Sequence, residues 1–148
     1  MRSQLVLFAC SHNNGRSQIA NAFFNQLVDP RKARSIAAGL DPAARVQPEV
    51  IVVMREVGID LADVVPVALT GQMLTELDFV VTLGCDERCP TIPLSRRRDW
   101  HLRDPSDLTV DEVRVVRDEI RGLVTDLVND MGWAREPPRR EPAPTMTA

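Results

Sequence analysis

The hydrophobic residues of this chain form short continuous runs that alternate with longer periodic stretches. Residues 4–9 (QLVLFA) and 78–83 (DFVVTL) are short runs rich in apolar residues, the pattern of strands buried on both faces. A weaker strand is expected over 34–39, where it ends on Gly39, and another near Trp100. The pattern therefore predicts a sheet of four strands.

Helical periodicity fills the stretches between and after these runs. Apolar residues spaced by four after Ser17 predict a first helix that ends before Pro30. Pro48 suits the first turn of a second helix, and a shorter helix is expected over 69–77. The strongest amphipathic pattern follows Thr109, a candidate N-cap. Its inward positions are Val113, Val116, Ile120, Leu123 and Leu127.

Strands that alternate with helices predict an α/β fold. We expect a small four-stranded parallel sheet, Rossmann-like, with helices on both faces, formed by residues 1–131. Residues 132–148 hold four prolines and little to bury, so this tail is predicted to be disordered. In such sheets ligands bind at the carboxyl ends of the strands, where Cys10 and Gly84 both lie.

Composition narrows the classes of partner. The 148 residues carry a net charge of -3 and suffice for one domain without disulfides. With no basic excess and no apolar run long enough to span a membrane, neither nucleic acid nor a membrane is an expected partner. The first apolar run is too short for a signal peptide, so we expect a cytoplasmic monomer. In that compartment its three cysteines are more often catalytic, redox-active or metal-binding than structural.

The loop after the first strand has the composition of an anion site. Its free N–H groups at a helix start, with the fork of Arg16, would hold a tetrahedral oxyanion. The same donors stabilise a thiolate, so Cys10 is a candidate nucleophile to which Ser17 can donate a further hydrogen bond. A structural cysteine that ends a strand is the alternative interpretation. The oxyanion-binding candidates are Ser11, His12, Asn13, Asn14, Gly15 and Arg16, with no catalytic role for His12.

A second pair of cysteines, Cys85 and Cys89, stands four residues apart. On a helix this spacing places both on one face, close enough to form a disulfide after a modest rearrangement. A zinc site with His101 or Asp86 as further ligands is one alternative, and two buried structural thiols are another. Zinc favours four ligands and a tighter Cys-x2-Cys spacing, so no resident metal is predicted.

Several segments resemble the low-molecular-weight protein tyrosine phosphatase superfamily: VLFACSHNNGRSQIANAFF, SIAAG, VVTLGCDERCPTIP and DWHLRDP. The resemblance covers about residues 4–130, and the Arg-Ser-Gln that ends the loop is typical of the arsenate reductase branch. It implies that Cys10 attacks arsenate, that Cys85 attacks the adduct and releases arsenite, and that Cys89 takes over the disulfide, which thioredoxin reduces. A role in arsenic detoxification would follow.

The cysteine spacing departs from the best-known thioredoxin-coupled pattern. There a cysteine directly follows the leucine of the strand, whereas this chain has Gly84 at that place and a shorter spacing. A low-molecular-weight thiol such as mycothiol or bacillithiol is therefore an alternative reductant, and no tightly bound cofactor is expected. Some reductases of the superfamily bind potassium through Asn13 and an acidic residue of the first helix, where this chain has Asn21.

Asp104-Pro105 matches the Asp-Pro of the superfamily, whose aspartate protonates the leaving oxygen. Without the resemblance the same pair is typical of a turn. Tyrosine phosphatases of the superfamily usually carry aromatic rings beside this pair, but here Ser106 and Asp107 follow and the chain has no tyrosine.

A small inorganic oxyanion therefore fits the predicted pocket better than a phosphotyrosyl protein. Arsenate is the expected substrate, with phosphate or sulfate as competing anions. A low-molecular-weight phosphatase that uses the same nucleophile, arginine and acid is the alternative enzyme. A non-catalytic oxyanion or metal sensor is the alternative from a different class.

Overall fold

The computed structural model describes residues 2–84 and 94–135. Its parallel sheet has the strand order β2-β1-β3-β4. The strands are β1 (Gln4–Cys10), β2 (Ala33–Gly39), β3 (Phe79–Leu83) and β4 (Arg97–Trp100), and the helices are α1 (Arg16–Leu27), α2 (Pro48–Arg55), α3 (Gly71–Glu76) and α4 (Val110–Asp130). The predicted α/β class and the four-stranded parallel sheet are confirmed.

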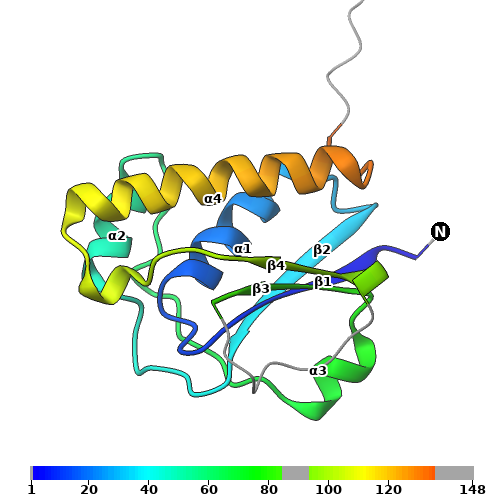
Figure 1. Cartoon of the computed structure of the whole chain (residues 1–148). Helices are drawn as coiled ribbons and strands as arrows, with labels where there is room; N and C mark the ends of the chain where they lie inside the picture. The colour runs from blue at the N-terminus through cyan, green and yellow to red at the C-terminus, as the bar shows by residue number, and fades with distance from the viewer. Residues whose placement is uncertain (1, 85–93, 136–148) are drawn as a thin grey trace, which may run out of the picture.

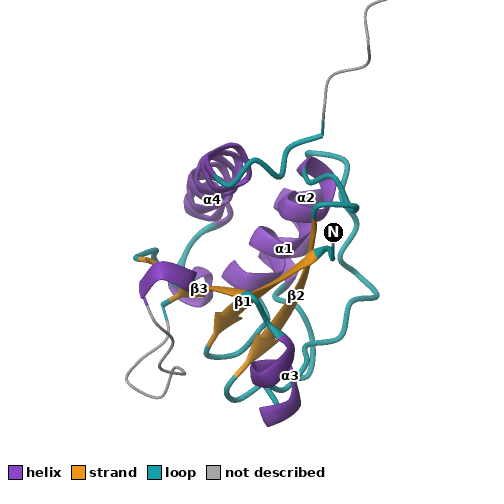
Figure 2. Ribbon diagram, turned by 90° about the vertical axis from the view of Figure 1, so that its right-hand side faces the viewer, coloured by secondary structure: helices purple, strands orange, loops and turns teal. Residues whose placement is uncertain are grey.

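The sheet is covered on both faces, as its strand pattern predicts. Helices α1, α2 and α4 lie on one face and the short α3 lies on the other (Figures 1 and 2). Successive side chains of a strand point to opposite faces, so the central strand β1 serves both layers. Val6, Phe8 and Cys10 join the larger core cluster, whereas Leu7 and Ala9 join the smaller one on the α3 side.

Helix α4 begins at the predicted cap. The Oγ1 atom of Thr109 accepts a hydrogen bond from the N–H of Glu112 at 3.3 Å, and the Glu112 carboxylate accepts one from the N–H of Thr109 at 3.2 Å. This reciprocal pair satisfies two backbone donors that the first turn would otherwise leave free. No helix in the described ranges is both long enough and apolar enough to cross a membrane.

The packed chain continues beyond the domain boundary predicted at residue 131. Trp133 is buried, and its ring makes edge contacts with Phe24 and Phe79 at centroid distances of 6.0 Å. Its carbonyl also accepts a hydrogen bond from the N–H of Asp29 at 2.8 Å. The indole therefore belongs to the core rather than to the tail, and the remainder of the predicted tail, 136–148, lies outside the described residues.

An ion pair fastens α2 to α4. The Arg114 guanidinium contacts both carboxylate oxygens of Glu56, at 2.9 and 2.7 Å, and Arg117 adds a contact at 2.8 Å. Arg117 also donates to the carbonyl of Val53 at 2.8 Å, so it holds the α2 backbone as well. The Arg114 hydrogen bonds, reinforced by Arg117 against the opposing effect of burial, lower the pKa of Glu56 to about 2.

Replacing Glu56 with glutamine is expected to lower the melting temperature at pH 7, because the amide cannot pair with two guanidinium groups. The folded-state pKa of Glu56 is lowered, from 4.5 to about 2, so its stabilising contribution is complete above the ordinary value and is lost as pH falls toward the lower one. Melting curves of wild type and Glu56→Gln should therefore differ at pH 7 and converge near pH 2. Glu119→Gln, an exposed change on α4, is the control. A constant difference across this pH range would contradict the role of the ionised pair.

Candidate active site

Cys10, the predicted nucleophile, lies where the helices that connect neighbouring strands switch from one face of the sheet to the other. Cys10 is the last residue of β1, and Gly84 directly follows the neighbouring strand β3. From β1 the chain enters α1 on one face, whereas α3, on the other face, precedes β3 (Figure 1). The carboxyl ends of β1 and β3 thus border the crevice in which ligands of parallel sheets bind. Cys10 is buried there, with 3% of its surface exposed.

The peptide carbonyls of the loop after β1 point away from the sulfur. Those of Cys10, Ser11, His12 and Asn14 accept hydrogen bonds from the backbone N–H groups of Leu40, Asp41, Ala43 and Gln47, at 2.8 to 3.2 Å. A trans peptide places its C=O and N–H on opposite sides, so the N–H groups that follow these carbonyls turn to the other side of the loop. The N–H of Asn13 confirms the direction, because it lies 3.2 Å from Cys10 Sγ. The loop is therefore a cradle lined by backbone donors.

A buried network fixes the Ser17 hydroxyl beside the same sulfur. Asn13 Oδ1 accepts hydrogen bonds from the N–H of Val67 at 2.8 Å and from Gln18 Nε2 at 2.9 Å. Gln18 Nε2 also donates to the carbonyl of Asn13 at 3.0 Å, which fixes the orientation of its amide. Asn13 must then present its Nδ2 to Ser17, and the observed separation from Ser17 Oγ is 2.8 Å.

This network leaves the Ser17 hydroxyl hydrogen available to a Cys10 thiolate. Its oxygen accepts a hydrogen bond from Asn13, so its own hydrogen is free for Cys10 Sγ, 2.8 Å away. Asn13 contacts Cys10 Sγ through its backbone N–H and Ser17 Oγ through its side-chain Nδ2. Its backbone adopts the left-handed conformation, with φ of 52°. Together with the Asn13 N–H, the sulfur thus has two donors, which is the environment that a thiolate requires.

Arg16 is buried at the start of α1, with 8% of its surface exposed. Its NH1 atom donates to the carbonyl of Leu102 at 3.1 Å, and its NH2 atom lies 3.7 Å from Asp104 Oδ2. A guanidinium has five N–H donors, so these contacts leave donors for an oxyanion. The structure therefore brings the predicted anion-binding arginine and the predicted acid to the same end of the sheet.

Asp104 caps a short 3-10 turn, Pro105–Asp107, and its Oδ1 accepts a hydrogen bond from the N–H of Ser106 at 3.0 Å. Burial by itself raises the pKa of this carboxyl, but the Ser106 hydrogen bonds and the charge of Arg16 outweigh burial and lower it. The ligand-free site therefore holds Asp104 as a carboxylate. An acid role requires that a bound anion raise its proton affinity.

The other residues considered from the sequence, His12, Asn14 and Asn21, contact neighbouring segments of the chain. His12 is exposed, and its Nδ1 lies 3.0 Å from the carbonyl of Asp41. Asn14 contacts Gln47 through both its carbonyl and its side chain. Asn21, at the position of the acidic potassium ligand in some reductases, accepts a hydrogen bond from Ser35 at 2.6 Å.

The second and third cysteines of the predicted relay, Cys85 and Cys89, lie outside the described residues, as does Asp86. The helical spacing predicted for this pair is therefore untested. Within residues 2–84 and 94–135, no group of three or more His, Cys, Asp and Glu side chains is placed to hold a metal ion.

The structure adds site residues that sequence patterns did not indicate. These are the Gln18 side chain, the N–H of Val67, the carbonyl of Leu102 and the Gly84 backbone. Backbone groups leave no signal in the residue type, so Val67 and Leu102 could not have been found. The Gly84 position carried a weak signal, since a glycine after a buried strand often marks a close approach of another group.

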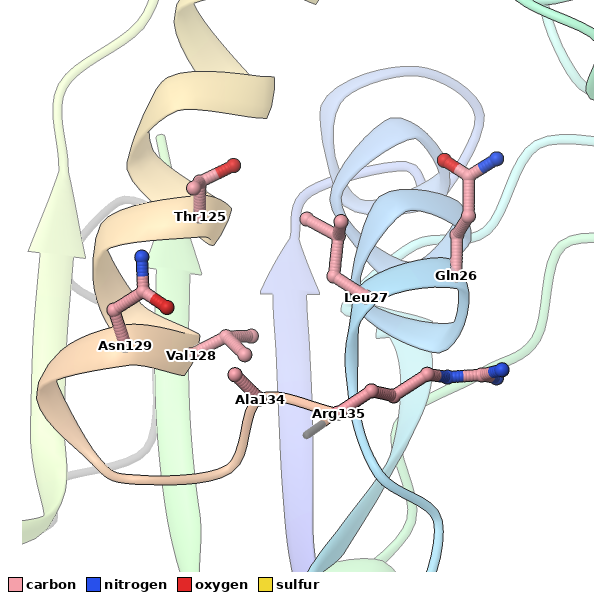
Figure 3. Close-up of a pocket in the computed structure, with 7 residues that line it drawn as sticks. All are labelled: Gln26, Leu27, Thr125, Val128, Asn129, Ala134 and Arg135. Atoms are coloured by element: carbon pink, nitrogen blue, oxygen red, sulfur yellow. The ribbon is translucent and has the colours of Figure 1, made fainter. Parts of the chain in front are cut away.

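A pocket of about 270 Å³ lies at the far end of α1 from the cradle, between α1 and α4 (Figure 3). Leu27, Val128 and Ala134 give it apolar walls, and Figure 3 shows these side chains directed toward one another. The other lining residues are Gln26, Thr125, Asn129 and Arg135. With neither an acid nor a nucleophilic thiol in its lining, this pocket is not a candidate for the chemistry.

Known proteins resemble the chain over nearly all of its described length. The model of the low molecular weight phosphotyrosine protein phosphatase family matches residues 5–136. A putative arsenate reductase of Halobacterium salinarum is 34% identical, over 83% of this chain and 89% of its own length. A glutaredoxin arsenate reductase of Synechocystis is 31% identical, over 83% of this chain and 95% of its own length.

Solved structures agree with this assignment. The thioredoxin-dependent arsenate reductase of Corynebacterium glutamicum superposes with a TM-score of 0.74 and 32% identity, over 88% of this chain. The chain spans 62% of that protein. The matched residues include the cradle, Arg16 and Asp104. By its sequence and its fold, the chain belongs to the low molecular weight phosphotyrosine protein phosphatase family.

Proposed function

We propose that this chain reduces arsenate to arsenite, with Cys10 as the nucleophile. The observation that carries the proposal is the set of donors around Cys10 Sγ: the Ser17 hydroxyl, the Asn13 N–H and the inward face of the loop. Such a site favours both a thiolate and the oxyanion that it attacks. Relatives named arsenate reductases, at 31 and 34% identity, support arsenate as that anion.

In the first step the Cys10 thiolate attacks the arsenic atom of arsenate. An S–As bond forms, one As–OH bond breaks, and the departing hydroxyl of the arsenate takes a proton from Asp104 and leaves as water. Arg16 and the loop N–H groups hold the remaining oxygens, whose charge is spread by these donors. Asp104 lies beside Arg16, at 3.7 Å, so the acid and the anion-binding fork serve the same ligand.

In the next steps Cys10 and Cys85 supply the two electrons that reduce arsenic. The Cys85 thiolate attacks Cys10 Sγ, which forms a Cys10–Cys85 disulfide, and the S–As bond breaks with its electron pair passing to arsenic. Arsenic thereby goes from As(V) to As(III) and leaves as arsenite. Cys89 then attacks Cys85, which forms a Cys85–Cys89 disulfide and frees the Cys10 thiolate for the next cycle.

We further propose that thioredoxin reduces the final disulfide, in keeping with the thioredoxin-dependent reductase of similar fold. A low-molecular-weight thiol is the alternative donor, and the glutaredoxin-named relative makes this second route chemically reasonable. On either route the enzyme would act as a cytoplasmic monomer in arsenic detoxification.

The second candidate is a phosphatase that uses the same Cys10, Arg16 and Asp104. The family match favours it, since that family is described by its phosphotyrosine phosphatases. The residues that follow the acid oppose it, because Ser106 and Asp107 are exposed and polar and provide no aromatic wall for a phenol ring. Phosphate ester hydrolysis is therefore expected as a weak side activity.

Serine variants of the three cysteines test the relay. Arsenate-dependent NADPH oxidation is measured with thioredoxin and thioredoxin reductase. Cys10→Ser should abolish turnover because no adduct forms, and Cys85→Ser and Cys89→Ser should each abolish multiple turnover because the disulfide cannot move on. Aryl phosphate hydrolysis is the matched control, since of the three cysteines it needs only Cys10 and should survive in the two later variants.

Three outcomes would contradict this relay. Full thioredoxin-linked turnover in both Cys85→Ser and Cys89→Ser would exclude an intramolecular disulfide pathway. Strong aryl phosphate hydrolysis without arsenate reduction by any thiol donor would support the phosphatase. Stoichiometric zinc in the purified protein, lost in Cys85→Ser, would support a sensor.

Removing the Ser17 hydroxyl tests its role at the sulfur. Ser17→Ala is expected to slow alkylation of Cys10 by iodoacetamide at pH 7 by about tenfold, because a hydrogen bond to a charged group contributes about 1.5 kcal/mol or more. Ser11→Ala is the matched control, since the hydroxyl at 2.8 Å from the sulfur belongs to Ser17. Equal alkylation rates in wild type and Ser17→Ala would refute the assigned donor.

The acid role is tested by Asp104→Asn, with Asp107→Asn in the same turn as the control. We expect kcat for aryl phosphate to fall by about 10²-fold or more in Asp104→Asn, as general acids typically contribute. The wild-type kcat should decrease as pH rises, because the bound complex must keep Asp104 protonated, and this decrease should be absent from the asparagine variant. An unchanged pH profile would argue against Asp104 as the proton donor.

A further inference from the structure

The guanidinium of Arg16 lies against the backbone of Gly84, the residue that follows β3. A Cβ atom built on Gly84 would stand 2.0 Å from Arg16 NH1, 2.7 Å from Cζ and 3.2 Å from NH2. Cβ contacts shorter than 3.0 Å essentially do not occur, so a side chain at position 84 and Arg16 in its present place exclude each other. Because Gly84 has no side chain, the Arg16 guanidinium can lie against its backbone.

A displacement of the Arg16 side chain would break its contacts with Leu102 and Asp104. Its NH1 is held by the carbonyl of Leu102 at 3.1 Å, and NH2 faces Asp104 at 3.7 Å. The side chain is 10% exposed, so a displaced guanidinium would lose contacts that offset its desolvation. A displacement would also change the distance from the fork to the cradle, because the Cα of Arg16 is fixed at the first turn of α1.

We propose that Gly84 is a positioning residue of the anion site, whose role is to set the depth at which Arg16 meets an oxyanion. The proposal rests on the proposed function only in taking Arg16 as the anion-binding group.

The test compares two glycines with similar positive φ angles. Gly84 has φ of +77°, and Gly58, after α2, has φ of +82° but nothing within 4 Å of its Cβ position. Alanine is disfavoured at positive φ at both sites, but only at Gly84 does its Cβ meet Arg16, so the comparison of Gly84→Ala with Gly58→Ala reports on that contact. The probe is inorganic phosphate, measured by calorimetry and by its protection of Cys10 against iodoacetamide.

Gly84→Ala is expected to weaken phosphate binding at least tenfold, whereas Gly58→Ala should leave it within twofold of wild type. Equal phosphate affinity in all three proteins would overturn the proposal. A wild type that binds phosphate but does not reduce arsenate would instead contradict the proposed function and leave the role of Gly84 intact.

A double-mutant cycle gives a readout that does not depend on the anion. In an Arg16→Ala background the clash is absent, so Gly84→Ala should lower the melting temperature less than it does in wild type. If Gly84→Ala alone does not fold, recovery of folding in the Arg16→Ala background supports the contact. Equal losses in both backgrounds, or failure to fold in both, would contradict it.

Discussion

The site depends on one requirement: a buried sulfur that carries negative charge must have hydrogen-bond donors. Cys10 ends the central strand β1, where it is buried. The loop meets the requirement by directing its carbonyls outward, to the backbone of residues 40–47, so that its N–H groups face inward. The Ser17 hydroxyl, which accepts a hydrogen bond from Asn13, can donate its own hydrogen to a thiolate 2.8 Å away. The same hydrogen-bond donors thus serve the proposed nucleophile and the proposed anion site.

A second consequence concerns the opposite charges of Asp104 and Arg16. In the ligand-free site the carboxylate compensates part of the arginine charge, and the pKa of Asp104 is lowered. An incoming oxyanion brings its own negative charge to the same fork, which reverses the electrostatic balance at Asp104. In the proposed mechanism Asp104 would therefore take up its proton only with an oxyanion bound beside Arg16, which would couple proton delivery to binding.

The elements and the chemistry-bearing side chains followed from the sequence, but their supporting contacts did not. Apolar runs located β1 and β3, and the cap at Thr109 located α4, because each depends on local pattern. The spacing of Cys10 and Arg16 after a buried strand located the cradle. The network from Val67 to Ser17 could not be predicted, since it links residues far apart in the chain through a backbone N–H.

The end of the packed chain was also beyond local pattern. A proline-rich composition predicts a tail from residue 132, yet Trp133 packs with Phe24 and Phe79. A large aromatic side chain buries much apolar surface, and this favours packing even in a segment whose other residues have little to bury. Composition averages over a window, whereas packing is decided residue by residue.

The outward carbonyls of the loop have a consequence for which changes residues 40–47 can tolerate. Their partners are backbone N–H groups, so these hydrogen bonds do not depend on the side chains at the donor positions, which are Leu40, Asp41, Ala43 and Gln47. Proline alone is excluded there, because it has no N–H. The prolines of this stretch stand at 42 and 48, between and after the donors. A proline at any one of these four positions would therefore remove one of the hydrogen bonds that turn the loop carbonyls outward, whereas other substitutions would leave that N–H in place.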